Sequence, residues 1–197
     1  MKNNFKSAFL PIDIEEDFLP TGSMKVPNGD KVIPIVNKVL NQKGKLFDLA
    51  VATKDWHPED HCSFIVNGGI WAIHCVRNTK GAEFPKVLLS EKFDKIIEKG
   101  TDSKVDSYSG FFDNDHISQT GLDKYLKENN VKRLFVAGLA TDYCVKFTVL
   151  DALTLGYEVI VIIDACAAVN VHPEDEANAI SEMIAHGAVI VTSDEIL

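Results

Sequence analysis

Apolar and polar positions divide the chain into two kinds of segment that follow one another in regular order. Continuous runs of apolar residues predict buried strands, at residues 7–13, 46–53, 93–100, 132–140, 157–165 and 188–193. Apolar residues at helical spacing predict helices, at residues 32–44, 121–130, 141–156 and 173–187. Strand and helix alternate most clearly in the second half of the chain.

The composition of the predicted strands indicates the kind of sheet. A strand with one face in water alternates apolar and polar residues, whereas a strand covered on both faces is apolar throughout. Segments such as KRLFVAGLA and YEVIVIIDA are of the second kind. We therefore predict an α/β fold of three layers, doubly wound and Rossmann-like, with a mostly parallel sheet between helices.

Length and charge narrow the class of protein. The chain has 197 residues, which suits a single domain over residues 1–197. A net charge of −9 without a basic cluster argues against a nucleic-acid partner. The sequence has neither an apolar run of membrane-spanning length nor a start typical of a secretory leader, so we expect a cytoplasmic protein with no membrane partner.

The cysteines contain no CxxC pair, so free thiols are expected at Cys62, Cys75, Cys144 and Cys166. Cys144 differs from the others in position, because it follows a predicted strand and lies in the first turn of the next helix. The N–H groups and the dipole at a helix start lower the pKa of a thiol, and the same N–H groups can bind an oxyanion. The sequence thus predicts a nucleophile, with a cysteine used only for packing as the alternative.

A candidate metal site lies in the segment DWHPEDH, directly after the second predicted strand. Asp55 and His57 are two residues apart, so their side chains leave an extended backbone on the same side. His61 belongs to the same segment, and His74 follows a Gly-Gly break in WAIHC. A carboxylate with two or three imidazoles is a common ligand set for first-row divalent metals. On spacing alone, a polar loop with surface histidines remains the alternative.

Two further residues lie at the ends of predicted strands. Asp13 ends the first strand, and Lys99 ends the third. In doubly wound folds, functional side chains gather at the carboxyl ends of the strands, where Asp55 and Cys144 also lie. Asp13 could accept the proton of a thiol, but a structural aspartate and a solvated surface lysine are the alternatives for these two positions.

These segments, taken together, resemble those of a known family, the nicotinamidase/pyrazinamidase branch of the isochorismatase-like cysteine hydrolases. Five blocks carry the resemblance, in this order: PIDIEEDF, VATKDWHPEDHCSF, WAIHCVRNTKGAEF, EKGTDSKVDSYSGF and VAGLATDYCVKFTVLDAL. They are spread along the chain from residue 11 to residue 153. The resemblance implies a catalytic triad at Asp13, Lys99 and Cys144.

The resemblance also implies the surroundings of the triad. Metal ligands fall on Asp55, His57 and His74, while the His61 position is an extra ligand in some members and a neighbour of the metal in others. Aromatic walls around the substrate ring fall on Phe18, Trp71 and Tyr108. A cis peptide is implied between Leu139 and Ala140, with the backbone N–H groups of Ala140 and Cys144 directed at the oxyanion.

The activity that the resemblance implies is hydrolysis of nicotinamide to nicotinate and ammonia in NAD salvage, through a thioester on the cysteine. Pyrazinamide is a further substrate by analogy. The cofactor would be one divalent metal ion, zinc before iron or manganese, since mixed carboxylate and imidazole ligands suit all three. A homo-oligomer is left open.

One departure from the family pattern keeps a rival function open. The family usually carries Gln-Asn where this chain has Glu15 and Glu16. Alternation along an extended segment would turn Glu15 towards Asp13, where like charge would raise the pKa of Asp13. A superfamily amidohydrolase acting on another small amide or ureido compound is therefore the alternative. A catalytically silent metal-binding protein on this fold is a third hypothesis, which the intact triad disfavours.

Overall fold

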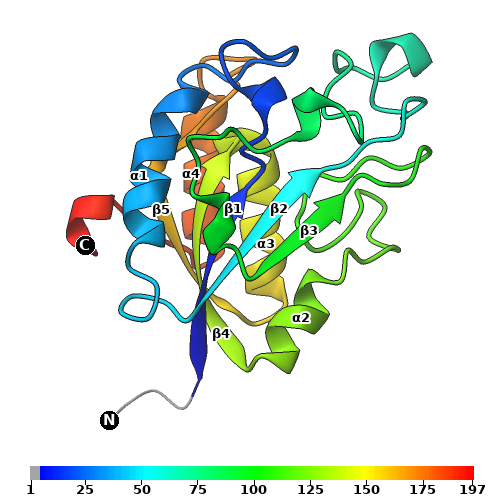
Figure 1. Ribbon diagram of the computed structural model, residues 1–197. Coiled ribbons are helices and arrows are strands. Elements are labelled where there is room, and N and C mark those ends of the chain that lie inside the picture. The colour runs from blue at the N-terminus through cyan, green and yellow to red at the C-terminus, as the bar shows by residue number, and fades with distance from the viewer. Residues whose placement is uncertain (1–4) are drawn as a thin grey trace.

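A six-stranded sheet between two layers of helices forms the body of the protein, as the computed structural model shows for residues 5–197, the part of the chain it describes (Figure 1). The strands lie in the order β3-β2-β1-β4-β5-β6, and every neighbouring pair is parallel. Their bounds are β1 Lys6–Ile12, β2 Leu49–Asp55, β3 Lys95–Lys99, β4 Val131–Leu139, β5 Glu158–Ala167 and β6 Val189–Val191. The predicted α/β fold with a doubly wound sheet is confirmed.

The helices cover both faces of this sheet. Helix α1 (Val32–Leu40) packs on one face, with Phe9 and Phe135 among its partners. Helices α2 (Leu122–Glu128), α3 (Lys146–Thr154) and α4 (Asp175–Ala185) pack on the other face. Alternation along β1 divides its side chains between the two cores, because Phe9 belongs to the first and Leu10 to the second. Strands buried on both faces explain the continuous apolar runs of the sequence.

Some strands and helices begin or end at other residues than predicted, because contacts with neighbouring segments determine where they stop. The second strand is predicted at 46–53 but runs from Leu49 to Asp55, because its pairing begins at Ala8↔Leu49 and ends at Asp55↔Lys99. The helix predicted at 141–156 begins with a π-helical turn, Thr141–Val145, before α3. This turn carries Cys144.

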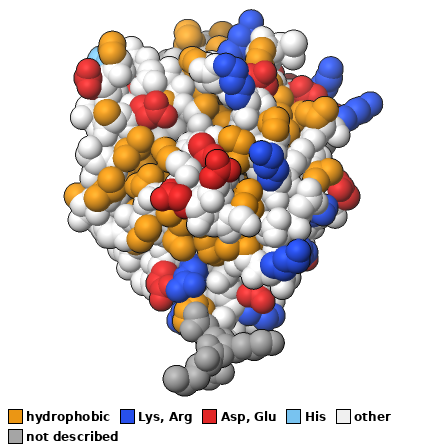
Figure 2. Space-filling view, turned by 90° about the vertical axis from the view of Figure 1, so that its left-hand side faces the viewer, with side chains coloured by type: hydrophobic (Ala, Val, Ile, Leu, Met, Phe, Trp, Pro, Cys, Tyr) orange, Lys and Arg blue, Asp and Glu red, His pale blue; other side chains and the backbone are white. Residues whose placement is uncertain are grey.

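Within residues 5–197, no helix is both long enough and apolar enough to cross a membrane. Figure 2 shows the side of the molecule that lies to the left in Figure 1, where acidic and basic side chains are interspersed with apolar ones.

Candidate active site

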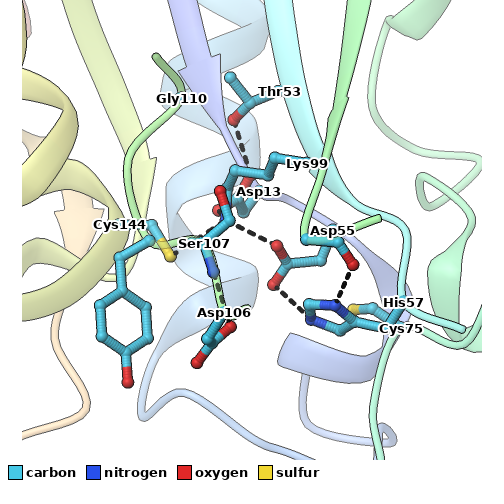
Figure 3. Close-up of polar contacts among 12 residues, drawn as sticks. Asp13, Thr53, Asp55, His57, Cys75, Lys99, Asp106, Ser107, Gly110 and Cys144 are labelled. Carbon is cyan, nitrogen blue, oxygen red and sulfur yellow. Dashed lines mark hydrogen bonds and ion pairs between the residues drawn. The ribbon is translucent and has the colours of Figure 1, made fainter. Parts of the chain in front are cut away.

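The topology brings four sequence-predicted residues to one edge of the sheet. Asp55 and Lys99 end neighbouring strands and are register partners. Asp13 follows Ile12, whose partner in β4 is Gly138, and Cys144 follows β4 by five residues. Because all these strands are parallel, their carboxyl ends meet at the same edge, and Figure 3 shows the side chains converging there.

A glycine in β4 allows β1 and β4 to approach each other closely. Gly138 has φ 120°, and a Cβ added to it would lie 2.1 Å from the carbonyl oxygen of Ile12. No other residue type fits there without moving one of the two strands. Gly138 thereby sets the separation of the two strands that carry Asp13 and Cys144.

Lys99 lies at the centre of the candidate catalytic group, which it forms with Asp13 and Cys144. Its Nζ is 3.0 Å from Asp13 Oδ2, 2.6 Å from Asp55 Oδ1 and 3.5 Å from Cys144 Sγ (Figure 3). It also donates to the carbonyl oxygen of Ser107 at 2.7 Å. Burial alone would lower the pKa of Lys99, but the carboxylates of Asp13 and Asp55 raise it well above its usual value. Lys99 is therefore a fixed positive charge, buried and paired with two acids.

The thiol of Cys144 does not behave as its place near a helix start predicts. The sequence predicts a lowered thiol pKa, whereas in the structure burial raises the pKa of Cys144 well above its usual value. Lys99 opposes this rise, and the nearby carboxylate of Asp13 adds to it. The prediction was wrong because removal from water outweighs the favourable charges. Cys144 is held as a thiol and needs a base to become a nucleophile.

Asp13 is placed to be that base. It is 1% exposed, and its backbone has a left-handed φ of 45°, which turns the chain as β1 ends. Burial raises the pKa of Asp13, while Lys99 and a hydrogen bond of 2.6 Å donated by Thr53 Oγ1 oppose the rise. The Asp13 carboxylate also lies near the thiol of Cys144, since its charge adds to the rise in the pKa of that thiol. A carboxylate of raised pKa beside a thiol is suited to accept its proton.

The candidate metal ligands form a second group beside the first. Donor atoms of Asp55, His57 and His74 all lie within 4.8 Å of one another, and all three residues are buried. His57 Nδ1 is 2.9 Å from the carbonyl oxygen of Gly100, and His74 Nδ1 is 2.7 Å from that of Ala72. These contacts leave each Nε2 facing Asp55 Oδ2, at 3.5 and 3.9 Å. Metal-bound histidines usually donate their other N–H to a carbonyl in this way, so the residues fit a divalent ion.

Asp55 links the two groups through its two oxygens. Burial would raise the pKa of Asp55, but Lys99 and then His57 hold it below its usual range. One oxygen contacts Lys99 and the other faces the histidines (Figure 3). Asp55 therefore stays an anion that serves both the lysine and the metal site.

His61 lies behind the metal group. Its ring stacks on His57 with centroids 4.0 Å apart, and its Nδ1 is 2.7 Å from Ser63 Oγ. It joins His57 and Asp106 in a separate cluster of donor atoms. Burial and the neighbouring His57 lower the pKa of His61 to about 4, which keeps the ring neutral.

A cavity of about 40 Å³ opens between the two groups. One buried water needs roughly 10–15 Å³ of such volume, so the cavity accommodates a small molecule. The predicted aromatic residues all line it: Phe18, Trp71 and Tyr108. Ala140 and Cys144, the two predicted oxyanion residues, line it as well, and the peptide bond Leu139–Ala140 is cis as the family resemblance implies.

The comparison with protein families is decisive. The sequence model of the Isochorismatase domain matches residues 7–195. The chain belongs to the isochorismatase family.

Several members of the isochorismatase family are close to it along their whole length. The chain is 40% identical to a nicotinamidase of Escherichia coli over 94% of each chain. A crystal structure described as PnC1 from L. infantum in complex with nicotinate has a TM-score of 0.93 at 35% identity, covering 98% of this chain and 96% of that one. A pyrazinamidase of Pyrococcus horikoshii in complex with zinc has a TM-score of 0.83 at 42% identity, covering 95% and 99%. The family resemblance predicted from the five sequence blocks is confirmed.

Some residues of this isochorismatase-family site were missed by the sequence reasoning. Tyr143 lines the cavity and packs edge-to-face on Trp71 with ring centroids 5.0 Å apart. Its place next to the cysteine in TDYC was a signal that could have identified it. Thr53 and Ser107 act through single contacts with Asp13 and Lys99, which no sequence pattern marks.

The two departures from the family pattern lie in different surroundings. Glu15 is fully buried and accepts a hydrogen bond from the backbone N–H of Asp55. Glu16 is half-buried and lines a separate surface groove. As alternation along the segment predicts, Glu15 lies near Asp13, whose charge adds to the rise in the pKa of Glu15. Neither residue lines the cavity beside Cys144.

Proposed function

We propose that this protein hydrolyses nicotinamide to nicotinate and ammonia, as the names of two similar relatives suggest. The observation that carries the proposal is the contact of Lys99 with both Cys144 and Asp13, beside an aromatic cavity that Cys144 lines. A thiol, a base and a buried cation in contact are the parts that attack on a carboxamide requires.

The chemistry follows from the positions of these groups. Asp13 accepts the thiol proton as the sulfur of Cys144 bonds to the carboxamide carbon, and the C=O electron pair moves to the oxygen. Backbone N–H groups of Ala140 and Cys144 are the donors we assign to that oxyanion. Asp13 then gives the proton to the leaving nitrogen, the C–N bond breaks, and ammonia leaves a thioester behind.

Hydrolysis of the thioester completes the cycle. A water loses a proton to Asp13 as its oxygen attacks the acyl carbon, and the C–S bond breaks to release nicotinic acid, which loses its remaining proton to solvent to become nicotinate. The sulfur regains a proton from Asp13, so the thiol state favoured by burial is restored. Lys99 keeps the buried Asp13 ionised at the start of each half of the reaction.

Asp55, His57 and His74 are the residues that would hold the metal. A divalent ion bound there would supply a Lewis acid for a ring nitrogen of the substrate, beside the cavity that Cys144 lines. We propose zinc, since a relative of known structure was crystallised with zinc. Phe18 and Trp71 line the same cavity and present apolar surfaces to a ring held in this way.

The proposal extends to the compartment. All four cysteines lie in the described residues and all are free thiols. Free thiols are maintained in a reducing environment, so we propose the cytoplasm.

An amide panel tests the substrate. Ammonia release is measured on zinc-loaded protein with nicotinamide, pyrazinamide, benzamide and an aliphatic ureide at equal concentration. We expect nicotinamide to be hydrolysed with the highest kcat/KM and benzamide, which lacks the ring nitrogen, to be far slower. Preference for the ureide would overturn the assignment in favour of the rival amidohydrolase. That rival loses its main support in the structure, because Glu15 and Glu16 do not line the cavity.

A further inference from the structure

The strand β2 continues past the point where its neighbour β1 ends. Within the described residues, the register pairs of β1 with β2 are Ala8↔Leu49 and Phe9↔Ala50, while β1 pairs with β4 as far as Ile12↔Gly138. The last residues of β2 therefore lack a strand partner on the β1 side. Their backbone N–H groups still need acceptors, because they are buried.

Successive N–H groups of a parallel strand point to opposite neighbours. Trp56 donates its N–H to the carbonyl oxygen of Lys99 in β3, at 2.9 Å. The N–H of Asp55, one residue earlier, consequently faces the β1 side. There it meets Oε1 of Glu15, which comes from the chain just beyond β1. The Glu15 carboxyl replaces the carbonyl that a longer β1 would have offered.

The residue held in this way matters more than its neighbours in β2. The side chain of Asp55 contacts Lys99 through Oδ1 at 2.6 Å and faces His57 and His74 through Oδ2. Any shift of the Asp55 backbone changes both the catalytic group and the metal group. Outer partners that orient a metal-binding carboxylate have large effects on metal affinity for this reason.

We propose that Glu15 is a positioning residue, whose carboxyl oxygen fixes the Asp55 backbone and so sets the geometry of the metal site. The inference rests on the proposed function, because it assigns Asp55 to the metal. Glu15 acts as a hydrogen-bond acceptor and not as a charge. Its second oxygen, Oε2, is buried and has no hydrogen-bond partner among the described residues. A glutamine at this position would offer the same acceptor without the charge.

Two substitutions of Glu15 distinguish the effect of its hydrogen-bond acceptor from the effects of its charge and its side-chain volume. Glu15→Gln keeps the acceptor and removes the charge. Glu15→Leu fills a similar volume and removes the acceptor, which leaves the Asp55 N–H buried without a partner. Glu16→Gln and Glu16→Leu are the matched controls, since Glu16 is adjacent in sequence but has its side chain outside the cavity.

The main measurement is zinc affinity, by competition with a chromophoric chelator, together with kcat and KM for ammonia release and the thermal midpoint. We expect Glu15→Leu to lose roughly 10–100-fold in zinc affinity, the range typical of an outer metal partner. Glu15→Gln and both Glu16 variants should retain the affinity of the unaltered protein. A merely structural role would lower the thermal midpoint of Glu15→Leu without changing the zinc affinity of the folded fraction.

Two results would overturn the inference. One is unchanged zinc affinity in Glu15→Leu, and the other is a loss in Glu15→Gln as large as that in Glu15→Leu. If Glu15→Leu does not fold, the result for Glu15→Gln alone decides. The variant His57→Ala shows whether a negative result rejects the role of Glu15 or the proposed function itself. Zinc binding that survives His57→Ala rejects the metal site itself, whereas zinc binding lost in His57→Ala but kept in Glu15→Leu rejects only the role of Glu15.

Discussion

The catalytic group and the metal group lie side by side but are held together by different means. Side chains of the catalytic group hold one another, because Lys99 contacts Asp13 and Cys144 directly. The histidines of the metal group are each held by a backbone carbonyl, His57 by Gly100 and His74 by Ala72. The contacts around Lys99 fix the positions of charges and protons. The contacts to backbone carbonyls fix the direction in which the Nε2 lone pairs of the two histidines point. The two groups should therefore fail separately when altered.

The largest effect is expected from Cys144→Ala, which removes the nucleophile and leaves the histidines untouched. Ammonia release from nicotinamide should fall by on the order of 10⁴-fold or more, as in other hydrolases that lose a nucleophile. Zinc content, measured by mass spectrometry, should stay at the level of the unaltered protein. Cys166→Ala is the control, since Cys166 is free but does not line the cavity. Turnover by Cys144→Ala close to that of the control would reject Cys144 as the nucleophile.

His57→Ala should differ from Cys144→Ala in its zinc content, because it removes a metal ligand and leaves the nucleophile in place. Loss of a direct ligand should weaken zinc binding by more than the roughly 10–100-fold that an outer partner contributes. Chelator competition measures this, and zinc content after gel filtration gives the stoichiometry. His172→Ala, at an exposed position in the chain, should leave both unchanged. The separation of the two groups is wrong if zinc is retained while ammonia release disappears.

The two groups also differed in how far the sequence could predict them. Asp13, Asp55 and Lys99 lie at strand ends, and a parallel sheet brings strand ends together whatever the loops do. His74 lies in the irregular stretch between β2 and β3, where neither strand nor helix periodicity places a side chain. Residue type made it a candidate ligand before the family resemblance added to that prediction, and its approach to Asp55 came only from the structure.

Contacts that depend on tertiary packing could not be predicted at all. The hydrogen bond of Thr53 to Asp13 joins residues of two strands whose relative register the sequence does not give. The pKa of Cys144 was predicted in the wrong direction, because burial is a property of the folded chain and outweighs the local helix start. Bounds of β2 were displaced for a similar reason, since its partners and not its own residues end it.

A smaller effect on zinc binding is expected from substitution of Gly100, and comparison with Gly121 separates backbone strain from displacement of His57. Gly100 has φ 60°, and a Cβ added to it would lie 2.4 Å from His57 Cε1, whereas Gly121 has φ 94° and nothing within 4 Å. Gly121→Ala should lose about 1–2 kcal/mol of unfolding free energy from the left-handed backbone alone. Gly100→Ala should lose more and should also bind zinc more weakly. Urea unfolding and chelator competition measure the two quantities, and equal zinc affinity in the two variants would contradict the fit of His57 against Gly100.

The smallest and most specific effect is expected from Thr53→Val, which removes a hydrogen bond of 2.6 Å to Asp13 and nearly preserves volume. Burial already raises the pKa of Asp13, and the Thr53 hydroxyl opposes that rise. Only the ionised carboxylate can accept the thiol proton, so activity falls as pH decreases through this pKa.

Loss of the hydroxyl raises the pKa of Asp13 further, and the acid limb of the kcat/KM profile should therefore move to higher pH. Thr148→Val is the matched control, because Thr148 is equally buried but its hydroxyl accepts from the backbone N–H of Gly110. Its acid limb should coincide with that of the unaltered protein even if its stability falls. An acid limb that stays in place in Thr53→Val would mean that a group other than Asp13 limits activity at low pH, and Asp13 would lose its role as the base while Cys144 kept its own.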